Sequence, residues 1–202
     1  MNPIIEGLPD TVRVGWDDVP IDTDFRTGIK FELLMQDPDI PPMDKVWMAL
    51  DLYYPDVPDD TVAAMNAIMW FYRCGKDEPK HEGLSGGREA PAYSFDFDAG
   101  RIIAAFLAQY QIDLTTCSMH WWVFRELFLA LEDRHLITKV MGWRGMKITG
   151  GMSREQKAFY ARMKSAYALP VVAMAEEMTL AARNQQMVDY VTRRYKEAGL
   201  LC

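Results

Sequence analysis

The sequence predicts a mainly α-helical fold: a compact multi-helix domain with a small N-terminal β-hairpin and a long C-terminal amphipathic helix. Half of the 202 residues are hydrophobic and 12% are aromatic, which is enough apolar material for a substantial core. Apolar residues recur at steps of three and four along most of the chain, a spacing typical of helices. Alternation with period two, typical of strands, is clearest in residues 11–22.

The first elements that we expect are two short β runs within residues 11–22. Val12, Val14 and Trp16 share one parity of the alternating pattern. A turn at residues 15–18 would join the two runs into a small hairpin.

Three helices are expected to follow. Aspartate or threonine at a helix start can accept the first free N–H groups, proline suits the first turn, and glycine suits the end. The second helix carries Val46, Trp47, Leu50 and Tyr53 as its apolar residues. The first helix is expected to start at Thr23 or Asp24 and to end before Pro38. The second starts at Pro42 and ends before Pro55. The third starts at Asp59-Asp60 and ends at Arg73 and Gly75.

The middle of the chain begins with a polar loop, rich in glycine and proline, at residues 76–92. A short strand is expected at residues 93–97. Asp96 or Asp98 then caps a fourth helix.

Three further helices are expected before residue 170. One follows Ser118, and a shorter one covers residues 136–143. Ser153 and Gln156 have the spacing of a capping box at the start of the third.

Pro170 marks the last boundary, so we expect a helical domain at residues 1–170 and a C-terminal helical extension at residues 171–202. The extension is predicted to be one long amphipathic helix that packs either on its own domain or on another chain. Its stripe consists of Met174, Met178, Ala181, Val188, Val191 and Tyr195.

Charge is unevenly distributed along the chain, whose net charge is −7. Residues 1–60 carry 14 acidic and 4 basic side chains, a net charge of −10. Residues 134–164 carry 1 acidic and 8 basic side chains, a net charge of +7. The basic band either binds an acidic partner, such as nucleic acid, or complements the acidic part of this chain or of a neighbouring copy. We favour the second interpretation, because the acidic remainder would repel nucleic acid. The band includes Arg144, Lys147, Arg154, Lys157, Arg162 and Lys164.

The motifs that could support catalysis are weak. Residues 83–87 match the G-x-S-x-G pattern of serine hydrolases, but both flanks are typical of loops, whereas that nucleophile needs a strand before it and a helix after it. His81, His120 and His135 lack the three- or four-residue spacing of helical metal ligands. We therefore expect no enzymatic activity, no cofactor and no metal.

Trp121 and Trp122 form the most unusual local feature. Adjacent residues on a helix point about 100° apart, so both indoles enter the core only if the helix is well buried. We favour the core for them, and an exposed anchor for a protein partner is the alternative.

Several segments, taken in order over residues 8–170, resemble the bacteriophage "gp-fifteen" family of long-tailed phages and prophages. The set as a whole carries the resemblance. It comprises residues 22–26 (DTDFR), 70–76 (WFYRCGK), 93–98 (YSFDFD), 104–107 (AAFL), 109–110 (QY), 112–114 (IDL), 120–122 (HWW), 141–142 (MG), 157–160 (KAFY) and 167–170 (YALP).

The resemblance implies a gene placed between those of the major tail protein and the tape-measure protein. Proteins encoded there are commonly tail-assembly chaperones, which coat the helical tape-measure protein and recruit tail-tube subunits. The resemblance brings no catalytic residues. The implied partners are therefore the tape-measure protein and the major tail protein, bound in the cytoplasm of the bacterial host.

We accordingly expect a tail-assembly chaperone that holds amphipathic helices in apolar grooves between its own helices. The candidate interaction residues are Trp121, Trp122, Met174, Met178, Val188 and Val191. One alternative is a minor structural tail component that self-associates through its acidic and basic regions. A nucleic-acid-binding protein that uses the basic band is the less favoured alternative.

Location follows from what the sequence lacks. No apolar run approaches the roughly 20 residues that are needed to cross a bilayer. The N-terminus has no basic patch followed by an apolar stretch. We therefore expect a cytoplasmic protein without a membrane span.

Overall fold

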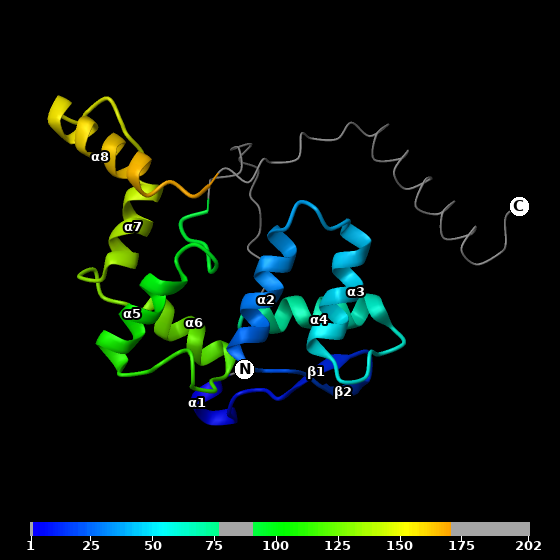
Figure 1. Ribbon diagram of the computed structural model, residues 1–202. Helices are drawn as coiled ribbons and strands as arrows, with labels where there is room; N and C mark the ends of the chain where they lie inside the picture. Colours follow the sequence, from blue (N-terminus) through cyan, green and yellow to red (C-terminus); the bar gives the residue numbers. More distant parts are fainter. Residues whose placement is uncertain (1, 77–90, 171–202) are drawn as a thin grey trace, which may run out of the picture. The chain divides into compact units, whose positions relative to one another are not determined.

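A computed structural model describes residues 2–76 and 91–170 of the chain (Figure 1). The chain divides into two units, Met1–Leu169 and Pro170–Cys202. The described residues of the first unit are mainly helical with one two-stranded antiparallel sheet, so the mainly helical fold with an N-terminal hairpin is confirmed for them. The predicted C-terminal helix lies outside the described residues, as does most of the predicted loop at 76–92.

The N-terminal segment contains a one-turn helix, α1 (Pro3–Glu6), and the predicted hairpin of β1 (Thr11–Val14) and β2 (Asp17–Pro20). The strands are antiparallel, with Val14 opposite Asp17. Only Gly15 and Trp16 lie between these paired residues, so the turn is shorter than the predicted turn at residues 15–18. Gly15 in this turn has a φ of 61°, a left-handed conformation that glycine adopts without strain. Trp16 beside it is 90% exposed and does not follow Val12 and Val14 into the core.

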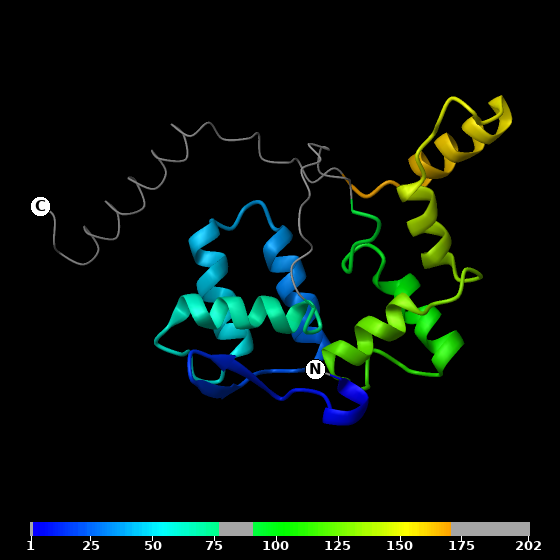
Figure 2. The same cartoon turned by 180° about the vertical axis from the view of Figure 1, so that it is seen from behind.

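The next three helices are α2 (Phe25–Gln36), α3 (Pro42–Tyr53) and α4 (Thr61–Tyr72), each within two residues of its predicted limits. Asp24 caps α2 by accepting from the backbone N–H of Arg26 at 2.8 Å, and Asp60 caps α4 by accepting from Ala63 at 2.9 Å. In both views α2 and α3 form a helical hairpin and α4 runs across the pair (Figure 1, Figure 2).

The segment before α5 (Ala99–Tyr110) is a series of turns, so the strand predicted at residues 93–97 is wrong. Asp98 occupies the N-cap position of α5, but its side chain accepts no capping bond from that helix. The carboxylate instead accepts from the backbone N–H of Ser94 at 3.0 Å and from two arginines. The residues that indicated a strand therefore form a tight turn around this carboxylate.

Helix α6 (Trp121–Leu129) begins three residues after Ser118, and His120 is its cap. The Nδ1 atom of His120 accepts from the backbone N–H of Trp122 at 3.1 Å. Two further backbone bonds join the starts of α2 and α6: Phe25 N–H donates to the Met119 carbonyl, and Trp121 N–H donates to the Thr23 carbonyl. This pairing holds the two helix starts side by side.

Helices α7 (Leu136–Gly145) and α8 (Arg154–Ala166) complete the first unit, and the predicted capping box of Ser153 and Gln156 is present. Helix α8 packs against α7 and buries none of its own residues. None of the described helices is long and apolar enough to cross a membrane.

The core is aromatic and lies where α2, α4 and α6 meet. Phe124 of α6 stacks on Phe25 of α2 at 5.0 Å and on Phe106 of α5 at 5.3 Å between ring centroids. Trp121 stacks on Tyr72 of α4 at 5.2 Å. Aromatic side chains from four helices thus pack around the start of α6.

Candidate protein-interaction surfaces

The two adjacent tryptophans at the start of α6 are both buried, so the structure does not support them as exposed anchors for a partner. The indole N–H of Trp121 donates to the Tyr72 carbonyl at 2.9 Å, and that of Trp122 donates to the Phe71 carbonyl at 2.8 Å. Those carbonyls lie at the end of α4, where helix carbonyls lack partners within the helix. Both indoles therefore join α6 to α4 and belong to the core.

Arg144, which belongs to the predicted basic band, is also buried, with 8% of its side chain exposed. Its Nη1 and Nη2 atoms bind the two oxygens of Asp98 at 2.5 and 3.1 Å. Arg144 also donates to the carbonyls of Tyr167 and Ala92, at 2.7 and 3.1 Å, and Arg101 adds a bond to Asp98 at 2.6 Å. Arg144 thus pairs with a buried carboxylate of its own fold and is not available to bind a partner.

The electrostatics of Asp98 follow from this pairing. Burial alone would raise the pKa of its carboxyl group, but the hydrogen bonds from Arg144, Ser94 and Arg101 and the charge of Arg144 hold that pKa below its usual value. The carboxylate therefore remains ionised. It joins Ser94, α5 and α7, and Arg144 extends the network to the carbonyls of Ala92 and of Tyr167 after α8.

The rest of the basic band is divided between exposed and half-buried side chains. Lys147, Arg154 and Arg162 are exposed, whereas Lys157 and Lys164 are half-buried. Lys157 donates to the Gly150 carbonyl at 3.2 Å. The exposed charge of the band is therefore smaller than the sequence alone indicated.

The remaining predicted interaction residues lie outside the described residues. They are Met174, Met178, Val188 and Val191.

An exposed apolar strip on α3 was not among the predicted interaction residues. Met43, Trp47 and Met48 are 59%, 51% and 47% exposed. Trp47 was assigned to the apolar side of this helix together with Leu50 and Tyr53, which are buried. The sequence could have indicated this strip, because apolar residues extend around more of the circumference of α3 than the neighbouring helices can bury.

A mostly apolar hollow of about 240 Å³ lies between α5 and α7. Small residues of α5 form one side of it, and Leu136, at the start of α7, forms part of the other. Leu107 of α5 follows the hollow one turn after Ala104 and is 52% exposed. The lining residues are Gly100, Arg101, Ala104, Ala105, His135 and Leu136.

A cluster of ionisable side chains joins α2, α4 and α6. The hydroxyls of Tyr72 and Tyr93 donate to Glu32, and Arg125 donates to Tyr93 at 3.3 Å. Burial and then the charge of Glu32 raise the pKa of both tyrosines, so they stay protonated and act as hydrogen-bond donors. The cluster ties helices together in the way that Asp98 does.

Within residues 2–76 and 91–170, no group of three or more His, Cys, Asp or Glu side chains has an arrangement that could hold a metal ion.

A family model described as "Bacteriophage Gp15 protein" matches residues 4–169, which is more than half of the chain. The matched range includes α3, the hollow between α5 and α7, and all of α8. A search of curated proteins and a search of solved structures each found no match.

Proposed function

The chain belongs to the bacteriophage Gp15 protein family, as its ordered motifs predicted, and from this premise we propose that it is a tail-assembly chaperone. In this function it binds helices of the tape-measure protein, tail-tube subunits, or both, in the cytoplasm of the bacterial host. Its function is protein binding and not catalysis.

The observation that carries the proposal is the apolar hollow between α5 and α7, which suits a helix-in-groove contact. Gly100, Ala104 and Leu107 lie on one side of α5, at steps of three and four residues. The small residues allow the backbone of a partner helix to come close, and Leu107 and Leu136, 52% and 46% exposed, supply apolar area at the edges.

An amphipathic helix is the occupant that fits this hollow. It would bury an apolar stripe against α5 and α7 and leave its polar face in water. A tape-measure protein is long and helical, so it offers such stripes along its length, and a chaperone that covers them prevents its aggregation before the tail tube assembles.

Co-expression of this chain with the tape-measure protein from the same phage tests the proposal. The tape-measure protein is expected to be soluble with the wild-type chain and to precipitate without it. In the Ala104→Glu/Leu107→Glu variant, one charge enters the hollow and a second lies at its edge, and the soluble fraction is expected to fall toward that without the chain.

Val62→Glu is the matched control, because Val62 is an apolar residue of α4 that is 72% exposed and lies away from the hollow. It should retain wild-type solubilisation. A tape-measure protein that is equally soluble with and without the wild-type chain would exclude the chaperone function.

A further inference from the structure

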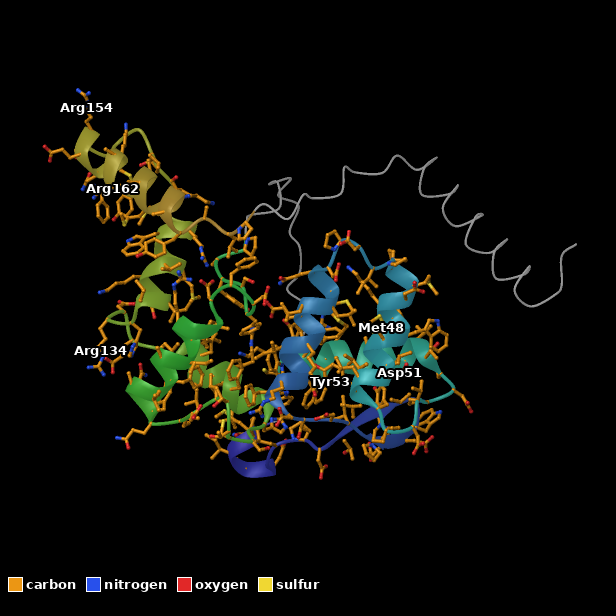
Figure 3. The ribbon with its side chains drawn as sticks, in the orientation of Figure 1. Met48, Asp51, Tyr53, Arg134, Arg154 and Arg162 are labelled. Atoms are coloured by element: carbon orange, nitrogen blue, oxygen red, sulfur yellow. The ribbon has the colours of Figure 1, made fainter. Side chains whose placement is uncertain are left out.

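The outward side of α3 combines apolar area with negative charge, and we refer to Met43, Asp44, Trp47, Met48 and Asp51 as the α3 face. At about 100° per residue these five side chains span an arc of about 140°. The opposite side of the helix is buried through Ala49, Leu50 and Tyr53. Figure 3 labels Met48 and Asp51 on this helix.

The two carboxylates of the α3 face have no partner in their own fold. Neither Asp44 nor Asp51 makes a hydrogen bond or an ion pair within the described ranges, and the neighbouring Lys45 donates to the Met35 carbonyl at 2.9 Å instead. The two carboxylates are seven residues apart on the helix, or about 10.5 Å along the axis. The face therefore presents two unpaired carboxylates, of which Asp51 is exposed and Asp44 is half-buried, at a fixed spacing among large apolar side chains.

The outward side of α8 has the complementary composition, and we refer to Arg154, Ala158, Ala161, Arg162 and Ser165 as the α8 face. All five residues are exposed. The two arginines are eight residues apart, about 12 Å along the helix, and small side chains lie between them. Arg154 and Arg162 are labelled in Figure 3.

The charges around the α8 face are mostly positive. Lys157 and Lys164 flank it and are half-buried, and Glu155 is the carboxylate of this helix. Among the described residues, neither Arg154 nor Arg162 forms an ion pair, and Arg162 lies 6.0 Å from the ring of Phe159.

We propose that the α8 face of one copy of this chain docks on the α3 face of a second copy. Met43, Trp47 and Met48 would pack over the alanines of α8. Asp44 and Asp51 would pair with the two arginines, whose separation along the helix axis is similar. Arginine suits such pairs because its planar guanidinium can bind a carboxylate through two parallel bonds.

A second copy is the occupant that the charges favour. Residues 1–60 carry a net charge of −10 and residues 134–164 a net charge of +7, so every copy offers both partners of the contact. Because the two faces lie on different helices, the contact is head to tail and leaves one α3 face and one α8 face free at the ends of a dimer. The contact therefore extends into chains or closes into rings.

Analytical ultracentrifugation of the purified full-length protein over a concentration series tests the proposal without any tape-measure protein, so the result is independent of the chaperone function. The wild-type average mass is expected to rise with concentration beyond that of a dimer. Asp44→Arg/Asp51→Arg and Arg154→Asp/Arg162→Asp should each remain monomeric, because each brings like charges together. An equimolar mixture of the two variants, and the variant with all four changes, should associate again.

Matched charge reversals elsewhere are the controls. Asp17→Arg/Asp18→Arg on β2 and Arg134→Asp/Lys139→Asp, which lie just before α7 and within it, change the net charge equally at exposed positions and should associate like the wild type. Wild-type protein that is monomeric at every concentration would overturn the proposal and leave the α3 face to another segment or protein. Reversal variants that associate normally, or a mixture that stays monomeric, would overturn it as well.

Discussion

Gly28, on the buried side of α2, lies directly against the indole ring of Trp121. A Cβ atom at this position would lie 2.2 Å from Cε3 of Trp121, far inside contact distance. The ring cannot move away easily, because its N–H bonds to the Tyr72 carbonyl and its face stacks on the Tyr72 ring. The close approach of α2 and α6 therefore depends on a residue without a side chain.

Gly28→Ala is expected to lower the free energy of unfolding by about 3 kcal/mol, the upper end for overpacking a buried site. Gly142→Ala in α7 is the matched control, because a Cβ there meets nothing within 4 Å. The control should be unchanged or raise stability by about 0.5–1 kcal/mol, since alanine favours helix. Urea denaturation of both variants measures the difference, and equal stabilities would contradict the packing described for Trp121.

The buried pair of Asp98 and Arg144 gives a second prediction at this scale. Asp98→Asn keeps the shape of the side chain but leaves the buried guanidinium of Arg144 without its counter-charge, so we expect a loss of about 3–5 kcal/mol. Asp18→Asn breaks the exposed pair of Arg13 and Asp18, whose side chains are 57% and 66% exposed, and should lose at most about 1 kcal/mol. Denaturant titration of both variants checks the prediction, and similar losses would mean that the Asp98 pair is not a structural centre.

Single residues were the hardest features to predict from the sequence. Asp98 stands at a helix start, where aspartate commonly caps the helix. Nothing in the local sequence indicates that its carboxylate would instead bind Arg144, 46 positions later. The exposure of Trp47 depends likewise on how much of α3 the neighbouring helices cover. Both outcomes are set by tertiary contacts, whereas the pattern of one segment carries only local information.

His120 connects three parts of the chain at the scale of elements. Its Nδ1 atom caps α6, its Nε2 atom lies 3.0 Å from the Pro9 carbonyl, and its ring contacts Phe71 of α4. Because Nδ1 accepts a bond, the proton of the neutral ring lies on Nε2 and is donated to Pro9. Burial lowers the pKa of His120 below 6.5, although the bond to Pro9 opposes this shift.

This arrangement predicts a stability that depends on pH. Below a pH of about 6.5 the unfolded chain binds a proton at His120 more readily than the folded chain does, so stability should fall as pH is lowered from about 7.5 to about 5.5. His120→Asn retains a capping oxygen but cannot titrate, and should lose less stability over this range. Thermal unfolding at several pH values measures both, and parallel curves would mean that His120 does not carry the dependence.

The elements that the sequence predicted best are those with local start and stop signals. Helices α2, α4 and α8 begin at Asp24, Asp60 and Ser153, whose side chains bond to the first turn in each case. Residues 93–97 have alternating aromatic side chains typical of a strand, but no neighbouring strand pairs with them in the described fold. They form a turn in which the backbone N–H of Ser94 donates to the Asp98 carboxylate.

At the scale of the whole molecule, the sequence shows how charge changes along the chain, but it does not show which charged residues lie on the same exposed surface. In the predicted basic band, Arg144 is buried, whereas the arginines of the α8 face are exposed. The acidic region is long, and only the fold shows that Asp44 and Asp51 share a helix face with exposed apolar side chains. The charge sums left pairing within the fold and pairing between copies both open, and the proposed contact depends on which residues the helix faces present.

The proposed contact between copies predicts a specific response to salt. Screening acts over about 10 Å at 0.1 M ionic strength and about 3 Å at 1 M, so the proposed Asp–Arg pairs weaken as salt rises. Two such pairs at about 0.7 kcal/mol each correspond to about a tenfold change in the association constant. Sedimentation of the wild type between about 50 mM and about 500 mM sodium chloride should show a loss of this size.

The neutral variant Asp44→Asn/Asp51→Asn separates the charged part of the contact from the apolar part. It keeps Met43, Trp47 and Met48, so it should associate more weakly than the wild type at low salt and respond little to added salt. Apolar contacts are not screened, and salts that are excluded from the protein surface strengthen them. A wild-type association that resists salt as the neutral variant does would therefore assign the contact to the apolar side chains alone and remove the two Asp–Arg pairs from it.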